Sequence, residues 1–311
     1  MGMLVDGKWT GEWYRPDEKG RFIRPDTVFH DRVSADGSSG FKAEAGRYHL
    51  YVSLACPWAH RTLIMRSLKG LKEAISISIV DPFMGDDGWA FSDYPGSIPD
   101  SIRGCEFLRQ VYVLARGDYT GRVTVPVLFD RETMSIVNNE SRQVMRMLDT
   151  EFDEVGDASV TYCPEGLREE VDKVIDLIYE PVNNGVYRAG FATTQDAYDE
   201  AVRSLFDALD YWDAHLSKEE YLLGKDITEA DWCLFTTLIR FDAVYYTHFK
   251  CNVRHIYEYP NLWRYLKTLY NHPGIAETCN FDHIKRHYFR SHKNINPTGI
   301  IPLGPLLDLS E

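Results

Sequence analysis

One cysteine stands in a setting that favours thiol chemistry. The segment Cys56-Pro57-Trp58-Ala59-His60-Arg61 has the form of a redox Cys-x-x-Cys turn in which Ala59 replaces the second cysteine. If a helix begins at Pro57, the Cys56 thiol faces unpaired N–H groups and the positive end of the helix dipole, and both favour the thiolate. Pro57 suits that position, because its missing N–H would have no helical partner. The alternative is an inert, buried cysteine.

Ala59 has a consequence for any catalytic cycle that uses Cys56. A mixed disulfide formed on Cys56 has no second cysteine close in sequence to resolve it. Resolution must then come from an external thiol, which attacks one sulfur of the mixed disulfide. The sequence therefore indicates a small-thiol co-substrate.

A proline interrupts the apolar run Val123-Thr124-Val125-Pro126-Val127. Because proline forfeits a ladder donor, it is confined to an edge strand or a cis turn. A cis-proline opposite Cys56 would expose the backbone of Val125 to an extended, peptide-like ligand. The alternative is an ordinary edge-strand proline.

Polar residues follow the last expected strand of this region. If a helix opens at Ser141, its N–H and hydroxyl can hold a carboxylate, while Glu140 accepts an ammonium group. The γ-glutamyl end of glutathione offers both groups. The alternative is simple N-capping by Ser141 or Asn139. Arg122 could supply a cation to a ligand carboxylate, or it could be an ordinary surface arginine.

Two groups of residues have the types and spacing that a metal could use. They are His248, Cys251 and His255, and the pair His283 and His287. No further ligand completes either set, so we expect hydrogen-bonded or solvated imidazoles and no metal.

The elements that must position Cys56 can be read from residue periodicity. Alternation predicts strands over 47–52 and 75–80, helical spacing predicts a helix over 57–69, and a hairpin is expected from 123–129 and 135–137. The order is βα…ββα, with Cys56 at a strand-to-helix junction. The glycine-rich stretch 81–119 is too long for a plain connection and is expected to be an irregular insertion.

The second half of the chain is expected to be all-helical. Apolar residues recur at three- and four-residue spacing over 167–177, 194–216, 227–247 and 259–269, and Thr228 with Asp231 resembles a capping box. We therefore expect an extended segment over 1–42, an α/β domain over 43–160, an all-helical domain over 161–290 and a tail over 291–311.

Composition excludes several classes of partner. The chain has 34 Lys and Arg against 47 Asp and Glu, a formal charge of -13, which repels nucleic acid and anionic lipid. No export signal and no apolar run long enough for a membrane span are visible. The six cysteines are scattered and form no disulfide framework, which fits a reducing, cytoplasmic location.

Taken together, these motifs resemble the glutathionyl-hydroquinone reductases, also called Xi-class glutathione transferases. The resemblance covers the chain from about Tyr48 onward. The residues that carry it are Cys56-Pro57-Trp58-Ala59-His60-Arg61, Asp87-Gly88-Trp89, Thr124-Val125-Pro126-Val127-Leu128, Asn139-Glu140-Ser141, Asn183-Asn184-Gly185-Val186-Tyr187, His248-Phe249-Lys250-Cys251-Asn252 and Asn296-Pro297-Thr298-Gly299.

The resemblance implies a thioredoxin-like N-terminal domain and a helical glutathione-transferase C-terminal domain. It implies reduction of glutathionyl-hydroquinones to hydroquinones through a Cys56-glutathione mixed disulfide that a second glutathione resolves. It also implies a homodimer. The glutathione contacts that it implies come from Trp89, Arg122, Val125, Glu140 and Ser141, and the implied phenol-binding tyrosines are Tyr187, Tyr245 and Tyr288.

Two other functions share most of these features. A general thioltransferase or dehydroascorbate reductase would use Cys56, Pro126 and the Glu140-Ser141 pair but would need no phenol-binding tyrosines. A catalytically silent transferase-like module would serve assembly only. Rates on a glutathionyl-hydroquinone and on a simple mixed disulfide, in wild type and Tyr187→Phe, separate the reductase from the thioltransferase. No turnover in the wild type would support the silent module.

Overall fold

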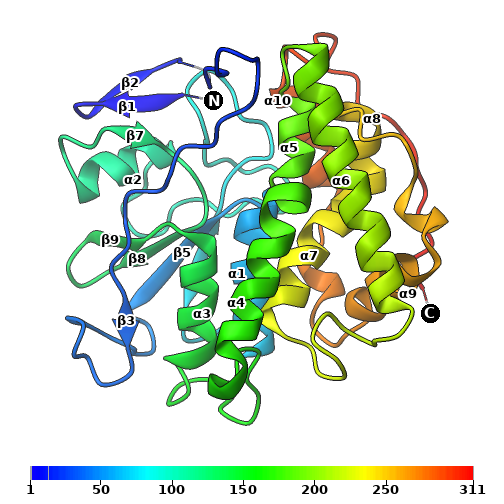
Figure 1. The fold of residues 1–311 in the computed structure, drawn as a ribbon. Helices are drawn as coiled ribbons and strands as arrows, with labels where there is room; N and C mark the ends of the chain where they lie inside the picture. The colour runs from blue at the N-terminus through cyan, green and yellow to red at the C-terminus, as the bar shows by residue number, and fades with distance from the viewer. Residues whose placement is uncertain (1, 13, 311) are drawn as a thin grey trace. The chain divides into compact units, whose positions relative to one another are not determined.

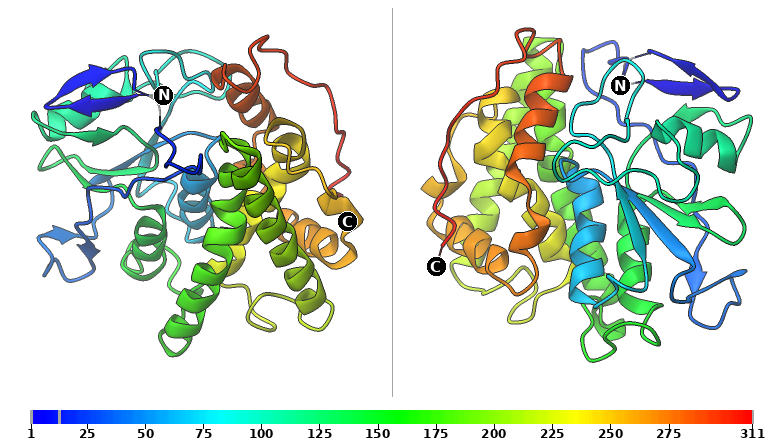
Figure 2. Two further views of the ribbon diagram at one scale, coloured as in Figure 1. Left: turned by 45° about the horizontal axis from the view of Figure 1, so that its top comes forward. Right: turned by 180° about the vertical axis from the view of Figure 1, so that it is seen from behind.

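The computed structural model describes residues 2–12 and 14–310. They form two compact units, each shown in ribbon form in Figures 1 and 2. The first unit takes residues 2–12, 25–161 and 277–291, and the second takes 14–24, 162–276 and 292–310. Both units therefore draw on the N-terminal stretch and on the end of the chain. The four consecutive segments expected from the sequence, with boundaries at 42, 160 and 290, differ from these two units and stay a prediction.

A four-stranded mixed sheet organises the first unit. Its strands are β5 Tyr48–Val52, β6 Ser76–Ile79, β8 Val127–Asp130 and β9 Ser135–Asn138, in the order β6-β5-β8-β9. β5 and β6 are parallel, while the β5–β8 and β8–β9 pairs are antiparallel. Every residue of β5 and β8 is buried, as expected for central strands.

The helices of the first unit complete a thioredoxin-like order. They are α1 Pro57–Leu68, α2 Leu108–Ala115, α3 Ser141–Thr150 and α10 Phe281–Ser291. Helices α1 and α3 pack against each other, and α2 contacts β9. From β5 to α3 the order is βαβαββα once the short strand β7 Gly121–Arg122, which belongs to another sheet, is set aside, so the expected fold is confirmed. β5, α1, β6 and β9 lie close to their predicted ranges, β8 begins four residues later than the predicted strand over 123–129, and α3 opens at Ser141 as the Glu140-Ser141 motif suggests.

Helix α2 lies inside the stretch 81–119 that the sequence predicts to be irregular. Its apolar residues Leu108, Val111, Tyr112 and Ala115 have helical spacing, and the first three are buried. Five glycines spread through the stretch obscure this short pattern. The stretch 81–119 is therefore irregular up to residue 107 and helical over α2.

The N-terminal residues of the first unit form short strands. β1 Met3–Val5 and β2 Lys8–Thr10 make a hairpin around Asp6 and Gly7, whose φ angles of 47° and 71° suit a two-residue turn. β1 also pairs with β7 Gly121–Arg122. A separate parallel pair joins β3 Val33–Ser34 to β4 Phe41–Lys42. Figure 1 shows β1, β2 and β7 in one small sheet.

The second unit is all-helical, as predicted. Its α-helices are α4 Arg168–Ile178, α5 Gly185–Gly190, α6 Gln195–Leu216, α7 Glu229–Arg240, α8 Tyr246–His248 and α9 Pro260–Tyr270. Shorter 3-10 turns are η1 Glu165–Leu167 and η4 Ile256–Glu258, while η5 Ala276–Thr278 lies where the chain leaves this unit. Helices α5 and α6 lie side by side (Figure 1), and every residue of α7 is buried.

Two π-helical turns interrupt this unit, η2 Tyr179–Asn183 and η3 Phe241–Tyr245. The helix that the sequence predicts over 227–247 is therefore three elements, α7, η3 and α8. Such turns occur frequently at functional sites. Among the described residues, no helix combines the length and apolar character needed to cross a membrane.

Candidate active site

Cys56 is the N-cap residue of α1, directly after the connection from β5. Its N–H donates to the Ser53 carbonyl at 3.2 Å, and its carbonyl accepts from the His60 N–H at 3.0 Å. Pro57 is the first residue of the helix, as predicted. The half-buried thiol therefore lies at the positive end of α1, where helix N–H groups point outward.

The thiol lies against the loop that contains Pro126. The Val125–Pro126 peptide bond is cis, and the Cys56 Sγ is 3.6 Å from the Val125 carbonyl oxygen. Tertiary folding has therefore brought together the two motifs that sequence analysis paired. Pro126 directly precedes β8, whose pairing with β5 brings this loop next to Cys56.

Glu140 and Ser141 lie at the start of α3. Glu140 is the N-cap residue, and its carboxylate accepts from the Arg142 N–H at 3.3 Å and from the Thr27 hydroxyl at 3.3 Å. The capping residue is thus Glu140 rather than Ser141 or Asn139. Asn139 instead has a buried structural position, since its side chain accepts from the Phe29 N–H at 3.1 Å. A capping carboxylate that is half-buried remains accessible to a ligand ammonium.

Arg61 links the thiol helix to the start of α3. Its Nη1 is 3.5 Å from the Ser141 hydroxyl, and its guanidinium carbon lies 4.5 Å from the centroid of the Trp58 ring. The side chain is almost fully buried, which is unusual for arginine. The sequence places Arg61 within the cysteine motif, on the helix expected after Cys56, but assigns it no role. Its place on that helix marks Arg61 as a neighbour of the thiol and gives no sign of its partner Ser141.

Trp89 is held by the C-terminal helix of the first unit. Its ring stacks on the His287 ring, with centroids 4.7 Å apart and an interplanar angle of 24°. His287 Nδ1 lies 3.0 Å from the Pro82 carbonyl, so the imidazole is held by this contact as well as by stacking on Trp89. Tyr288, the next residue of α10, is 1% exposed. The sequence suggests a hydrogen-bonded or solvated imidazole at His287 and gives no sign of its contact with Trp89.

Arg122 belongs to β7 and pairs with Met3 of β1. Its Nη1 donates to the carbonyl of Glu12. The predicted cation is therefore next to the N-terminal segment, for which the sequence suggested no role.

Tyr187 and Tyr245 lie together in the second unit. Their ring centroids are 6.0 Å apart at 59°, and both rings contact Phe249 at 5.3 and 5.5 Å. Tyr187 is in α5, and Tyr245 ends the π-helical turn η3. Tyr187 is 9% exposed and Tyr245 is fully buried. The other predicted site residues belong to the first unit.

The histidines considered as metal ligands have structural contacts instead. His248 Nε2 is 3.1 Å from His292 Nδ1, and His255 Nδ1 is 3.4 Å from a carboxylate oxygen of Asp242. His283 Nε2 is 2.8 Å from the Pro95 carbonyl. In the part of the chain that the structure describes, no three metal-ligating side chains cluster.

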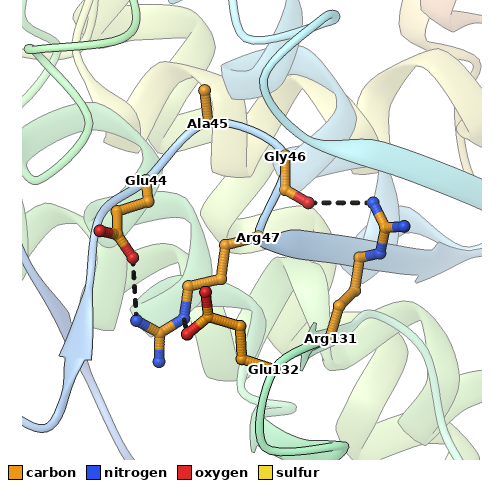
Figure 3. A pocket seen from close by; sticks show the side chains of 6 residues that line it. All are labelled: Glu44, Ala45, Gly46, Arg47, Arg131 and Glu132. Atoms are coloured by element: carbon orange, nitrogen blue, oxygen red, sulfur yellow. Dashed lines mark hydrogen bonds and ion pairs between the residues drawn. The ribbon is translucent and has the colours of Figure 1, made fainter.

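A hollow of about 530 Å³ lies at the other end of β5 from Cys56 (Figure 3). Its charges are paired: Arg47 is 3.1 Å from Glu44 and 3.4 Å from Glu132. Arg131 donates to the Gly46 carbonyl at 2.9 Å. None of the described residues that line this hollow is a cysteine, so we place the candidate site at Cys56 and not here.

Comparison with known proteins defines the class. Residues 55–151 match the family model for the glutathione S-transferase N-terminal domain, and residues 195–268 match that for the C-terminal domain. With the thiol at the start of α1, the fold is that of a glutathione transferase.

Relatives narrow the class to one family. The chain is 52% identical to glutathionyl-hydroquinone reductase YqjG of Escherichia coli, over 100% of this chain and 97% of that protein. It is 50% identical to glutathionyl-hydroquinone reductase PcpF of Sphingobium chlorophenolicum, over 98% and 96%. The Xi-class transferase of Natrialba magadii matches with a TM-score of 0.95 and 54% identity, over 100% and 95% of the two chains.

A glutathione-bound structure of YqjG matches with a TM-score of 0.92 and 51% identity, over 99% and 97% of the chains. This chain belongs to the Xi-class glutathione transferases, the glutathionyl-hydroquinone reductase family. The family resemblance seen in the sequence is confirmed.

Proposed function

We propose that this protein reduces glutathionyl-hydroquinones to hydroquinones, with glutathione as co-substrate. The observation that carries the proposal is the Cys56 thiol, placed at the start of α1, 3.6 Å from the Val125 carbonyl and with Ala59 where a resolving cysteine would stand. The names of YqjG and PcpF, each about half identical to this chain, support the same activity.

In the first step, the Cys56 thiolate attacks the sulfur of the conjugate. A sulfur–sulfur bond forms, the bond between sulfur and the ring carbon breaks, and its electron pair stays with the ring carbon. That carbon takes a proton, and the hydroquinone leaves. The ring is reduced by two electrons, and the two sulfurs are oxidised to the mixed disulfide.

In the second step, a second glutathione attacks the glutathionyl sulfur of the mixed disulfide. Glutathione disulfide leaves and the Cys56 thiolate is restored. Ala59 makes this step depend on an external thiol, since no cysteine of the motif can displace glutathione. The expected kinetic pattern is ping-pong.

Glutathione binding is assigned to residues of the first unit. The backbone of Val125, next to the thiol, can pair with the peptide of glutathione, and the Glu140 carboxylate can accept its ammonium group. Ser141 at the first position of α3 can hold the γ-glutamyl carboxylate. Trp89 and the Arg122 guanidinium are assigned to the remaining part of the tripeptide.

Binding of the aromatic ring is assigned to Tyr187, Tyr245 and Tyr288. Phenol hydroxyls that donate to the ring oxygens favour a keto tautomer, in which the bond between carbon and sulfur breaks more easily. The close packing of Tyr187 and Tyr245 supports a shared role for these two residues.

Mass spectrometry tests the nucleophile. After incubation with a glutathionyl-hydroquinone and no free glutathione, the intact protein should gain one glutathionyl group, located on Cys56. Cys56→Ser should gain none and lose turnover, whereas Cys105→Ser should behave like the wild type. Turnover by Cys56→Ser would refute the mechanism, and an inactive wild type would favour the silent transferase-like module.

A comparison of two substrates tests the role of the tyrosines. Tyr187→Phe should slow reduction of a glutathionyl-hydroquinone by about 10- to 100-fold, because it removes one hydrogen-bond donor to the charge that develops on the ring oxygen. Reduction of a simple glutathione mixed disulfide should be nearly unchanged. Equal losses on both substrates would favour the general thioltransferase.

We also propose that the protein is a cytoplasmic homodimer. The support is the family resemblance and the presence of all six cysteines as thiols in the described residues. Sedimentation should give about twice the chain mass of 35.9 kDa, and a species of single mass would contradict the dimer.

A further inference from the structure

Residues 14–24 of the N-terminal segment belong to the helical second unit and lie next to Tyr187. The Gly20 carbonyl accepts from the Thr193 N–H at 3.0 Å, and the Thr194 hydroxyl donates to the Lys19 carbonyl at 2.8 Å. Gly20 has a φ of +80°, and a Cβ there would lie 2.7 Å from Thr194. The segment is thus closely fitted against the start of α6.

An aromatic contact fixes the segment beside α5. Phe22 is 6% exposed, and its ring centroid lies 5.3 Å from that of Phe191, the residue that follows α5. Phe191 in turn lies 6.1 Å from the Tyr187 ring. Arg24 follows Phe22 by two residues and is therefore held close to the same rings.

Arg24 contacts the Tyr187 ring and the Asn184 side chain. Its guanidinium carbon is 4.8 Å from the centroid of the Tyr187 ring, and its Nε–H donates to the Asn184 side-chain oxygen at 2.9 Å. The Asn184 carbonyl accepts from the Tyr187 N–H at 3.0 Å. The Arg24 side chain therefore contacts two residues at the start of α5: the N-cap residue Asn184 and the ring of Tyr187 in the first turn.

We propose that Arg24 is a positioning residue of the ring-binding site. It holds the Tyr187 phenol in its orientation and places a positive charge beside it. The proposal rests on the proposed function, because Tyr187 is assigned there to the ring oxygen of the substrate. A fixed cation also stabilises negative charge that develops on that oxygen as the ring changes tautomer.

Neighbouring arginines provide a contrast. Arg21, on the same segment, is 2.7 Å from Glu200, and Arg188 is 3.3 Å from Glu180 and from Glu200. These pairs join the segment and the helices, and among the described residues Arg24 is the arginine that lies over the Tyr187 ring. Arg21→Gln therefore serves as a matched control that weakens the segment but leaves Arg24 in place.

A double-mutant cycle tests the proposal. Arg24→Gln should lower kcat on a glutathionyl-hydroquinone by about two- to thirtyfold, the range expected for a partly desolvated cation on an aromatic ring. In a Tyr187→Phe background, the same change should have almost no effect, because the hydroxyl that Arg24 positions is absent. Arg24→Lys should retain part of the rate, since it keeps the charge.

Three results would overturn the inference: an unchanged rate in Arg24→Gln, an equal loss in the Tyr187→Phe background, or an equal loss on a simple glutathione mixed disulfide. Arg21→Gln should retain wild-type rates, and a loss as large as that of Arg24→Gln would assign the effect to the segment as a whole.

A measurement without turnover separates this inference from the proposed function. With 3-fluorotyrosine at position 187, the ¹⁹F resonance should shift in Arg24→Gln and not in Arg21→Gln. If wild type fails to reduce glutathionyl-hydroquinones, the proposed function is refuted, while the ¹⁹F shift still decides whether Arg24 orients this ring. No shift in Arg24→Gln would refute the contact.

Discussion

Glu140 combines a structural contact with a proposed ligand contact. Its carboxylate caps α3 through the Arg142 N–H and also accepts from the Thr27 hydroxyl. A carboxylate that already satisfies N–H and O–H donors is held in one orientation. It can therefore meet a ligand ammonium without a large cost in side-chain entropy.

Neutralising this carboxylate tests its assignment. Glu140→Gln should weaken glutathione binding by about 10- to 100-fold, because a charge-assisted hydrogen bond to the ammonium becomes a neutral one. Calorimetric titration with glutathione measures the change. The control is Glu132→Gln, a 63% exposed residue in the hollow at the other end of β5, which should bind normally. Unchanged affinity in Glu140→Gln would remove Glu140 from the site.

At the scale of secondary-structure elements, two buried polar side chains join neighbouring elements through hydrogen bonds. His49 of β5 lies between two hydroxyls of the paired strand β6, with Nδ1 2.7 Å from Ser76 Oγ and Nε2 2.9 Å from Ser78 Oγ. Asp231 of α7 accepts from the Leu222 N–H, the Thr228 N–H and the Tyr265 hydroxyl. Both side chains are fully buried.

His49 should make stability depend on pH. Burial lowers the pKa of His49 from 6.5 to about 4, so the folded protein keeps the ring neutral while the unfolded chain takes up a proton. Stability is fully present above pH 6.5 and falls as the pH drops from 6.5 towards 4, by up to about 3 kcal/mol. Denaturant unfolding at several pH values should show this slope.

The variant His49→Gln removes the titrating ring, so its stability should change less with pH over the same interval. An identical slope in the variant would show that other groups cause the dependence.

Asp231 tests the capping box of α7. Burial raises the pKa of Asp231, while its donors favour the carboxylate. Asp231→Ala leaves these buried donors without their acceptor and should lower the free energy of unfolding by about 3 kcal/mol or more. Thermal unfolding measures the loss. Asp226→Ala, in the preceding exposed loop, should cost little, and a similar loss there would contradict the assignment.

At the scale of the whole molecule, the N-terminal segment supports the site through long-range contacts. Trp9 Nε1–H donates to the Asp86 carbonyl at 3.0 Å, in the turn that precedes Trp89. Gly88 has a φ of +82°, and a Cβ there would lie 2.8 Å from the Trp9 ring. The segment thus contacts the Trp89 turn, besides Arg122 and Glu140.

Trp9→Phe tests this support. The variant keeps an aromatic ring against Gly88 but loses the hydrogen bond to Asp86, so the Trp89 turn should be held less firmly. Glutathione affinity should fall about threefold, in line with one neutral hydrogen bond, with little change in kcat at saturation. Thr10→Val on the same strand is the matched control. If Trp9→Phe and Thr10→Val bind glutathione with equal affinity, Trp9 has a structural role only.

The amino-acid sequence by itself determined the parts that depend on near neighbours. Alternation defined β5 and β6, three- and four-residue spacing defined α1 and most of the second unit, and the Cys56-Pro57 pair defined the start of a helix. These features follow from backbone propensity and capping within a few residues, so they can be read locally. The same reading paired Cys56 with Pro126, and the structure places their loops in contact.

Tertiary structure alone decided the contacts that join distant parts of the chain. His287 stacks on Trp89, and Arg61 reaches Ser141. The N-terminal residues 12, 24 and 27 meet site residues, and residue 9 meets the turn that precedes Trp89. None of these pairs has a periodicity or spacing that marks it, because each arises when separate elements pack. Close packing of separate elements selects such partners, so Cys56 and the residues of the local motifs could be found from sequence, but the partners that they meet across the fold could not.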